Sequence, residues 1–273
     1  MSAIIVVENL LNIRQFGLHT ITANEEPAGS EAFRFATLRR PDHWSPTTTN
    51  ADAWIKSGFD RLRAWNFVAL WDHNLLGEGL RIQGSDDDFA TPPQTAFDAT
   101  LPTTPGAGSI DDALGVVTLD KMWLKRVPTR TTNAVRLYVP AMGAGQRPSI
   151  NGIVGMAYPF IRELGELPES DDKMAEETMT EAGYKGEGAA AFPRSGVLPI
   201  RMPSLFEWDA ARYHLHERYR RSPAVLIFDE QRAEQAILVK RPGGRQAPRQ
   251  GDESFYPRLA LAYAEHEPRE YGT

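Results

Sequence analysis

The sequence contains no cysteine, no excess of basic residues and no long hydrophobic run. Without a cysteine among its 273 residues, the chain forms no disulfide, thiolate zinc site or cysteine nucleophile, which fits synthesis in a reducing cytosol. The formal net charge is −6 and no long Lys/Arg run occurs, which argues against a nucleic-acid partner. No apolar run reaches the roughly 18 residues of a transmembrane helix, so we expect no membrane insertion. Met1–Glu8 lacks the basic start and cleavage site of a signal peptide, so we expect no export by the usual leader.

Proline and glycine are plentiful, and they divide the chain into short apolar segments. The 20 prolines and 22 glycines occur at short intervals, which favours a mainly β protein with long loops. A chain of this length accommodates either one large domain or two domains. The segments that we expect as strands in the first half are Ile4–Val7, Ala53–Lys56, Trp65–Trp71, Leu80–Gln83, Val116–Leu119, Met122–Val127, Asn133–Val139 and Ile150–Ile161.

The clearest of these patterns lies between Trp65 and Asp88. The run Trp65–Trp71 is almost entirely apolar, which predicts a strand buried on both faces. Turn-forming residues then interrupt it, and Leu80–Gln83 alternates apolar and polar residues as a half-buried strand does. The sequence therefore predicts a strand, a corner and a second strand within a β-sandwich.

The composition changes after Arg162. Residues Glu163–Gly188 are acidic, and Ser204 with Glu207 forms a capping box that predicts a helix as far as Tyr219. Further strands are expected at Ala224–Phe228, Ala236–Lys240 and Tyr256–Ala264. We therefore expect two units, a β-sandwich over residues 1–162 and a linker with a small α+β part over residues 163–273.

The order of these motifs resembles a known family. Phe67–Leu75 followed by Leu80–Ser85 resembles the corner of the discoidin-like (galactose-binding-like) jelly rolls found in tail proteins of tailed bacteriophages. Ala53-Trp54-Ile55 resembles the strand that precedes this corner, and Ala134–Val139 and Ile150–Gly155 resemble the last two strands. Residues Arg194–Lys240 are similar to the region that follows such a jelly roll in tail-tip proteins.

The resemblance implies a jelly-roll β-sandwich and a structural, non-enzymatic role in a phage tail tip or baseplate. The implied partners are other tail or baseplate proteins and further copies of the chain in a ring. The implied location is the virion tail, after synthesis in the host cytoplasm. The alternative function is a carbohydrate-binding module that contacts host surface glycans. A glycan-cleaving enzyme is a third hypothesis, but no pair of carboxylates stands out among the 36 acidic residues.

Two polar clusters are candidate sites with ordinary structural explanations. Asp72, His73 and Asn74 suggest a metal or catalytic cluster, but these residue types also form turns, and we interpret them as a structural corner. Asp86-Asp87-Asp88 lacks the ligand spacing of an EF-hand loop. We interpret it as a solvated acidic loop that is available for ligand or partner contacts, with a structural calcium ion as the alternative. No other metal or cofactor is expected.

Trp44 is the tryptophan that we expect to contact a ligand or partner. It lies in the polar loop Pro41–Asn50, where an exposed aromatic ring can stack on a sugar or anchor a protein interface. The remaining tryptophans lie on predicted strands or on the helix and are expected in the core. His214-Leu215-His216 does not form a zinc site, because the two imidazoles would point to different sides of a helix.

Overall fold

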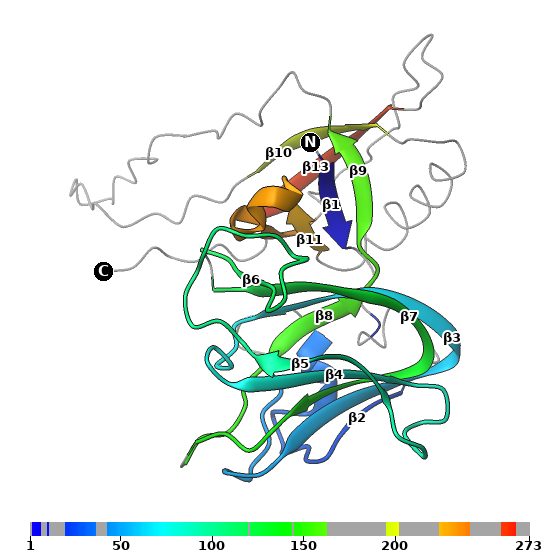
Figure 1. Cartoon of the computed structure of the whole chain (residues 1–273), viewed down its shortest axis with the longest axis vertical. Coiled ribbons are helices and arrows are strands. Elements are labelled where there is room, and N and C mark those ends of the chain that lie inside the picture. Colours follow the sequence, from blue (N-terminus) through cyan, green and yellow to red (C-terminus); the bar gives the residue numbers. More distant parts are fainter. Residues whose placement is uncertain are drawn as a thin grey trace, which may run out of the picture.

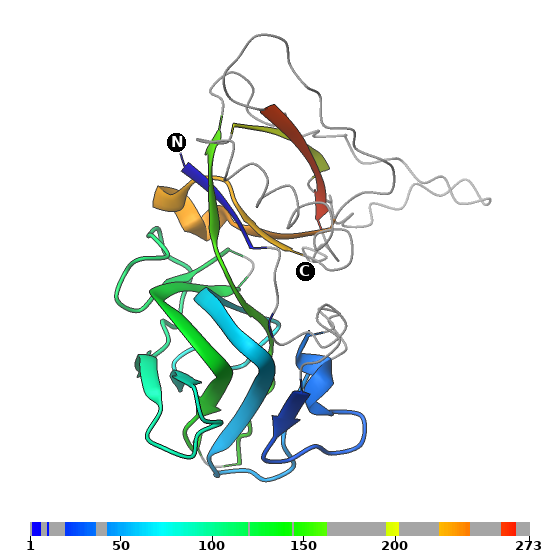
Figure 2. The ribbon, with the colours of Figure 1, turned by 90° about the vertical axis from the view of Figure 1, so that its right-hand side faces the viewer.

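A computed structural model shows a β-barrel stacked on a β-sandwich (Figures 1 and 2). The described residues are 2–6, 10, 20–36, 43–119, 121–143, 145–162, 195–201, 224–240 and 258–265. The helix expected at Ser204–Tyr219 and the acidic segment Glu163–Gly188 lie outside these ranges. Among the described residues, no helix has the length and apolar character needed to cross a membrane.

The sandwich is built from one seven-stranded antiparallel sheet that folds over on itself. The sheet has the order β2-β3-β7-β4-β5, with β6 beside β7 and β8 beside β3. The expected jelly-roll β-sandwich is therefore confirmed. Its strands are β2 (Thr20–Ala23), β3 (Ala53–Trp71), β4 (Gly79–Ser85), β5 (Gln94–Thr100), β6 (Val116–Val117), β7 (Trp123–Val139) and β8 (Asn151–Gly155), and a 3₁₀ helix η1 (Ala32–Ala36) lies beside β8 and β2.

Two long bent strands, β3 and β7, create both layers of the sandwich. Their pairing shifts register between Gly58 and Arg63 and again between Trp65 and Phe67, and Figure 1 shows both strands curving there. When residues of one strand are left out of the hydrogen-bond ladder, that strand bends. The four separate strands that the sequence suggested in these regions are therefore two continuous ones. Pro128 is accommodated because it lies within the second shift, where no ladder hydrogen bond is required.

The bend produces a front sheet and a back sheet. The front sheet contains β2, the first half of β3, the second half of β7, β4 and β5, and the back sheet contains β8, the second half of β3, the first half of β7 and β6. An apolar core between the sheets includes Trp65, Val68, Leu70, Trp123 and Leu137. The segment Asp86–Leu114 contains β5, which has a single large apolar side chain, Phe97, and lies at the edge of the front sheet.

The expected burial of Trp65–Trp71 on both faces is confirmed. Val68 and Leu70 face the core of the sandwich, whereas Phe67, Ala69 and Trp71 belong to a second apolar cluster beyond the back sheet. That second cluster also contains Ile4, Val6, Val225 and Ile227 of the barrel. The back sheet is therefore covered by the barrel.

The barrel closes in the order β1-β11-β12-β13-β10-β9, and all its strand pairs are antiparallel. The strands β1 and β9, from the first half of the chain, therefore pair with strands from the second half, unlike the expected division at residue 162. Since β1 and β9 are neighbours, the sandwich is an insertion between two adjacent barrel strands. The elements are β1 (Ser2–Val6), β9 (Tyr158–Arg162), β10 (Ser195–Arg201), β11 (Ala224–Ile227), β12 (Ile237–Lys240), β13 (Arg258–Glu265) and the 3₁₀ helix η3 (Glu230–Gln235).

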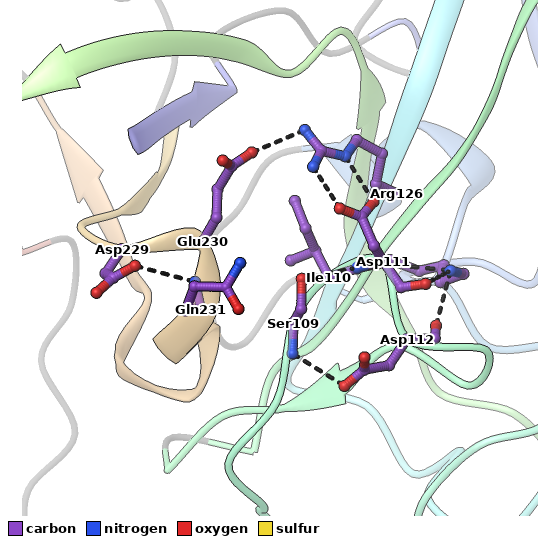
Figure 3. Close-up of polar contacts among 9 residues, drawn as sticks. Ser109, Ile110, Asp111, Asp112, Arg126, Asp229, Glu230 and Gln231 are labelled. Atoms are coloured by element: carbon purple, nitrogen blue, oxygen red, sulfur yellow. Dashed lines mark hydrogen bonds and ion pairs between the residues drawn. The ribbon is translucent and has the colours of Figure 1, made fainter. Parts of the chain in front are cut away.

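Arg126 joins the two units by ion pairs (Figure 3). Its Nε donates to Asp111 in the β5–β6 connection across 2.7 Å, and its Nη1 donates to Glu230 of η3 across 2.9 Å. The hydrogen bonds from Arg126 hold the pKa of the Asp111 carboxyl below its usual range. The neighbouring Lys125 donates to the carbonyl oxygens of Ile110, Asp111 and Asp112, which fixes the same connection. Polar contacts thus reinforce the apolar interface between barrel and sandwich.

Candidate functional site

The outer face of the front sheet carries two aromatic rings among charged side chains. Along the start of β3, Ala53 and Ile55 are 1% and 0% exposed and face the core. Because side chains alternate along a strand, Trp54 and Lys56 lie on the opposite, outer face, where both are half-buried. The strand pairings continue this face as two rows across the sheet, Trp54–Tyr138–Arg81–Asp98 and Lys56–Arg136–Gln83–Thr95.

Tyr138 is fixed in the first row by hydrogen bonds and a cation. Its hydroxyl donates to the carboxylate of Asp52, which also accepts from the backbone N–H of Ala141 across 2.9 Å. These hydrogen bonds lower the pKa of Asp52, and the bond to Asp52, followed by burial, raises the pKa of Tyr138. The guanidinium of Arg81 lies 5.4 Å from the centre of the Tyr138 ring and pairs with Asp98 across 3.0 Å. The first row therefore combines a fixed aromatic ring with a neutralised ion pair.

Arg136 occupies the centre of the second row. Its Nε and Nη2 donate to Oε1 of Gln83 across 3.1 and 2.8 Å. The guanidinium lies 4.2 Å from the centre of the Phe89 ring and 6.0 Å from that of Tyr138, both within the range of cation–π contacts. Burial lowers the pKa of Arg136. The guanidinium is oriented by Gln83, and within the described ranges no carboxylate neutralises its charge.

Lys56 lies directly opposite Arg136 on the neighbouring strand. Its ammonium pairs with the carboxylate of Asp88 across 2.8 Å. Asp88 follows β4 in a turn that requires positive φ at Asp88 (56°) and Phe89 (68°). This turn brings both the Asp88 carboxylate and the Phe89 ring to the edge of the outer face.

The acidic run Asp86-Asp87-Asp88 divides between two roles. The backbone carbonyl of Asp86 accepts from Asn133, and the Asp87 carboxylate accepts from the Ser85 hydroxyl across 2.7 Å, so both contacts shape the turn. Hydrogen bonds from Thr91 and Ser85 lower the pKa of Asp87. Only Asp88 has a contact with the outer face. In the described part of the chain, no group of three or more acidic or histidine side chains is arranged to hold a metal ion.

The expectation that Trp44 presents its ring to a ligand is wrong. Trp44 is 0% exposed and belongs to the core of the sandwich. Its backbone pairs with Ile150, and its indole nitrogen donates to the carbonyl of Glu25 across 2.9 Å. A loop that is polar in sequence therefore contributes a buried tryptophan to the core.

Asp72, His73 and Asn74 form the corner after β3. Asp72 adopts a positive φ of 49°, and Nδ1 of His73 accepts from the backbone N–H of Leu75 across 3.2 Å. The Asn74 amide donates to the carbonyl of Arg147 and accepts from the N–H of Ser149. These contacts tie the corner to the segment that leads into β8.

The sequence interpretation missed Trp54, Tyr138 and Arg136. All three lie at alternate positions of strands that the sequence did identify, Ala53–Lys56 and Asn133–Val139. Alternation places Val135, Leu137 and Val139 inward and leaves Arg136 and Tyr138 outward. The available signal was thus an aromatic residue at an outward position of a strand, rather than an aromatic residue in a loop.

Comparisons with solved structures give likenesses of low similarity. No family model and no curated protein matches the sequence. A Ruminococcus gnavus GH29 fucosidase in complex with fucose is similar at TM-score 0.42 and 10% identity, over 55% of this chain and 27% of its own. Chitosan-binding module 1 from the chitosanase/glucanase of Paenibacillus sp. IK-5 has TM-score 0.40 and 20% identity over 54% of this chain and 98% of its own. CpGH89CBM32-5 from Clostridium perfringens, in complex with GalNAc-beta-1,3-galactose, has TM-score 0.39 and 11% identity over 51% of this chain and 96% of its own.

Proposed function

We propose that this chain is a non-catalytic carbohydrate-binding protein and that the outer face of the front sheet holds the sugar. The observation that carries the proposal is the row Trp54–Tyr138–Arg81, in which two aromatic side chains and a guanidinium are cross-strand neighbours. A pyranose ring has an apolar face of C–H groups and an edge of hydroxyl groups. Aromatic rings suit the first, and charged or amide side chains suit the second.

The face is preorganised for such a ligand. Tyr138 is fixed by its hydrogen bond to Asp52, and Gln83 fixes the guanidinium of Arg136. Side chains that are already ordered lose little conformational entropy on binding. The barrel covers the back sheet, whereas Trp54, Arg136 and Tyr138 on the front sheet are half-buried and keep part of their surface accessible.

Binding without catalysis agrees with the carboxylates on this face. Glycoside hydrolysis requires a carboxylic acid with a raised pKa to protonate the leaving oxygen. The pKa of Asp52 is lowered, and the carboxylates of Asp88 and Asp98 are engaged in ion pairs with Lys56 and Arg81. Asp52 is therefore a poor general acid, and the other two carboxylates serve as counter-ions to Lys56 and Arg81.

The proposed setting is the tail tip or baseplate of a tailed bacteriophage, with further copies of the chain and other tail proteins as partners. The support for this setting is the order of sequence motifs that resembles phage-tail jelly rolls. In such an assembly the glycan would belong to the host surface. Electron microscopy of particles decorated with an antibody against this chain tests the setting, and labelling away from the tail would contradict it.

Glycan-array screening followed by calorimetry tests the binding itself. We expect Trp54→Ala to weaken glycan affinity about tenfold or more, because a central aromatic anchor is lost. Phe33→Ala is the matched control, since Phe33 is an exposed aromatic (42%) on η1 and is not a member of either row of the outer face. An array without signal for the wild-type chain would contradict the proposed function.

A further inference from the structure

We propose that the glycan is acidic and that Lys56 and Arg136 together receive the carboxylate of one of its sugar residues. This inference rests on the proposed function and adds the ligand class to it. It comes from the charge arrangement in the second row of the outer face, which differs from that in the first row.

Two like charges are directly opposed in the second row. Lys56 and Arg136 are cross-strand partners in the antiparallel pair of β3 and β7. Such a pair of like charges destabilises a sheet unless a counter-charge lies nearby. Asp88 pairs with Lys56, which leaves one net positive charge among the three side chains. A ligand carboxylate placed between the two cations would neutralise that charge.

Arg136 has donors available for this carboxylate. A guanidinium has five N–H groups, and Gln83 accepts from two of them, on Nε and Nη2. Among the residues that the structure describes, no acceptor engages the other three. A guanidinium held in one plane is suited to bidentate binding of a planar carboxylate. Because the Arg136 charge is partly buried, its attraction to an anion is screened less than that of a fully exposed arginine.

The position of the two cations also suits a sugar on Trp54. Trp54 and Lys56 are two residues apart on one face of β3, which corresponds to about 7 Å along the strand. Tyr138 and Arg136 have the same spacing on β7. A sugar ring over the aromatic pair therefore directs a ring substituent toward the cationic pair. Arg81 does not offer a comparable site, because Asp98 already neutralises it.

The test compares a hexuronic-acid oligosaccharide with its carboxyl-reduced, neutral counterpart by isothermal titration calorimetry. We expect the wild-type chain to bind the acidic probe at least tenfold more tightly, with a preference that falls as salt increases. We expect Arg136→Gln to bind the acidic and the neutral probe with about equal affinity. Arg136→Lys should retain part of the preference, because the charge remains but the bidentate geometry is lost. Arg61→Gln, which removes an exposed positive charge at the bend of β3, is the matched control and should leave the preference unchanged.

The outcomes separate the two proposals. Equal affinity for both probes, or an unchanged preference in Arg136→Gln with a native circular dichroism spectrum, overturns this inference and leaves the proposed function standing. Absence of binding to either probe and to every array glycan overturns both. A sulfated oligosaccharide that binds more tightly than the hexuronate would show that the site selects another anionic group and would overturn the assignment to a carboxylate.

Discussion

Trp65 and Thr132 are joined by a buried hydrogen bond where the two long strands bend. The indole nitrogen of Trp65 donates to the Thr132 hydroxyl across 3.0 Å, and that hydroxyl donates to the carbonyl of Ala134. We expect Thr132→Val to lower the free energy of unfolding by about 1–3 kcal/mol, because the buried indole N–H loses its acceptor at nearly constant side-chain volume. Urea denaturation measures the change.

Thr131→Val is the control for this substitution. Thr131 is the preceding residue of β7 and is exposed, so the same chemical change there should shift the free energy of unfolding by less than about 0.5 kcal/mol. Equal effects at the two positions would contradict the role assigned to the Trp65–Thr132 hydrogen bond.

Gly152 of β8 marks a position where β3 and η1 approach the backbone closely. A Cβ atom added there would lie 2.5 Å from the carbonyl oxygen of Ala69 and 2.8 Å from the side chains of Leu70 and Phe35. We expect Gly152→Ala to destabilise the fold by about 1–3 kcal/mol through overpacking, measured by thermal denaturation. Gly143→Ala meets no atom within 4 Å and should be nearly neutral. If Gly152→Ala left the stability of the fold unchanged, β8 would be able to move away from β3 at little cost in free energy.

The ion pair between Asp111 and Arg126 predicts an acid-dependent loss of stability. The folded protein holds the pKa of Asp111 below its unfolded value of about 3.9, so the stabilisation is complete above that pH. It is lost as the pH falls through the lowered folded-state pKa, because the carboxylate then takes up a proton. We therefore expect Asp111→Asn to be less stable than wild type at neutral pH, with a difference that narrows below about pH 4.

Urea midpoints measured across the acidic range test this expectation. Asp86→Asn is the control, because the Asp86 carboxylate accepts no hydrogen bond from the described residues. A difference between wild type and Asp111→Asn that stays constant with pH would show that protonation of Asp111 is not the cause.

The sequence predicted the sandwich because its strongest signals are local. The apolar run Trp65–Trp71 indicated burial on two faces, and the barrel supplies the second covering layer. Three features required tertiary information. The bends of β3 and β7 depend on register shifts between strands far apart in sequence, β5 has only Phe97 to signal it, and β1 finds its partners in the second half of the chain.

The candidate site was harder to predict for a different reason. Trp44 lies in a polar loop, but its ring is enclosed by the core and its indole donates to Glu25. Trp54 lies on a strand, a location that suggested burial, yet its neighbours Ala53 and Ile55 occupy the inward positions. The alternation of inward and outward positions along the strand therefore indicated which tryptophan is accessible, whereas location in a loop did not. The pairing of Trp54 with Tyr138 also depends on register, which alternation alone cannot give.

Ile4 lies where the barrel and the sandwich meet, so its substitution tests whether the two units unfold together. Its side chain is fully buried in the apolar cluster that joins β1 and β11 to the back sheet. We expect Ile4→Ala to cost about 2–5 kcal/mol, since the cavity would open where the two units meet. Calorimetry should show one transition for wild type and a broadened or divided transition for Ile4→Ala, because the shared cluster is what makes the units unfold together. Leu62→Ala removes an aliphatic side chain that is 55% exposed and should change neither the midpoint nor the shape. A single sharp transition in Ile4→Ala, shifted only in temperature, would place the coupling in the Arg126 ion pairs instead.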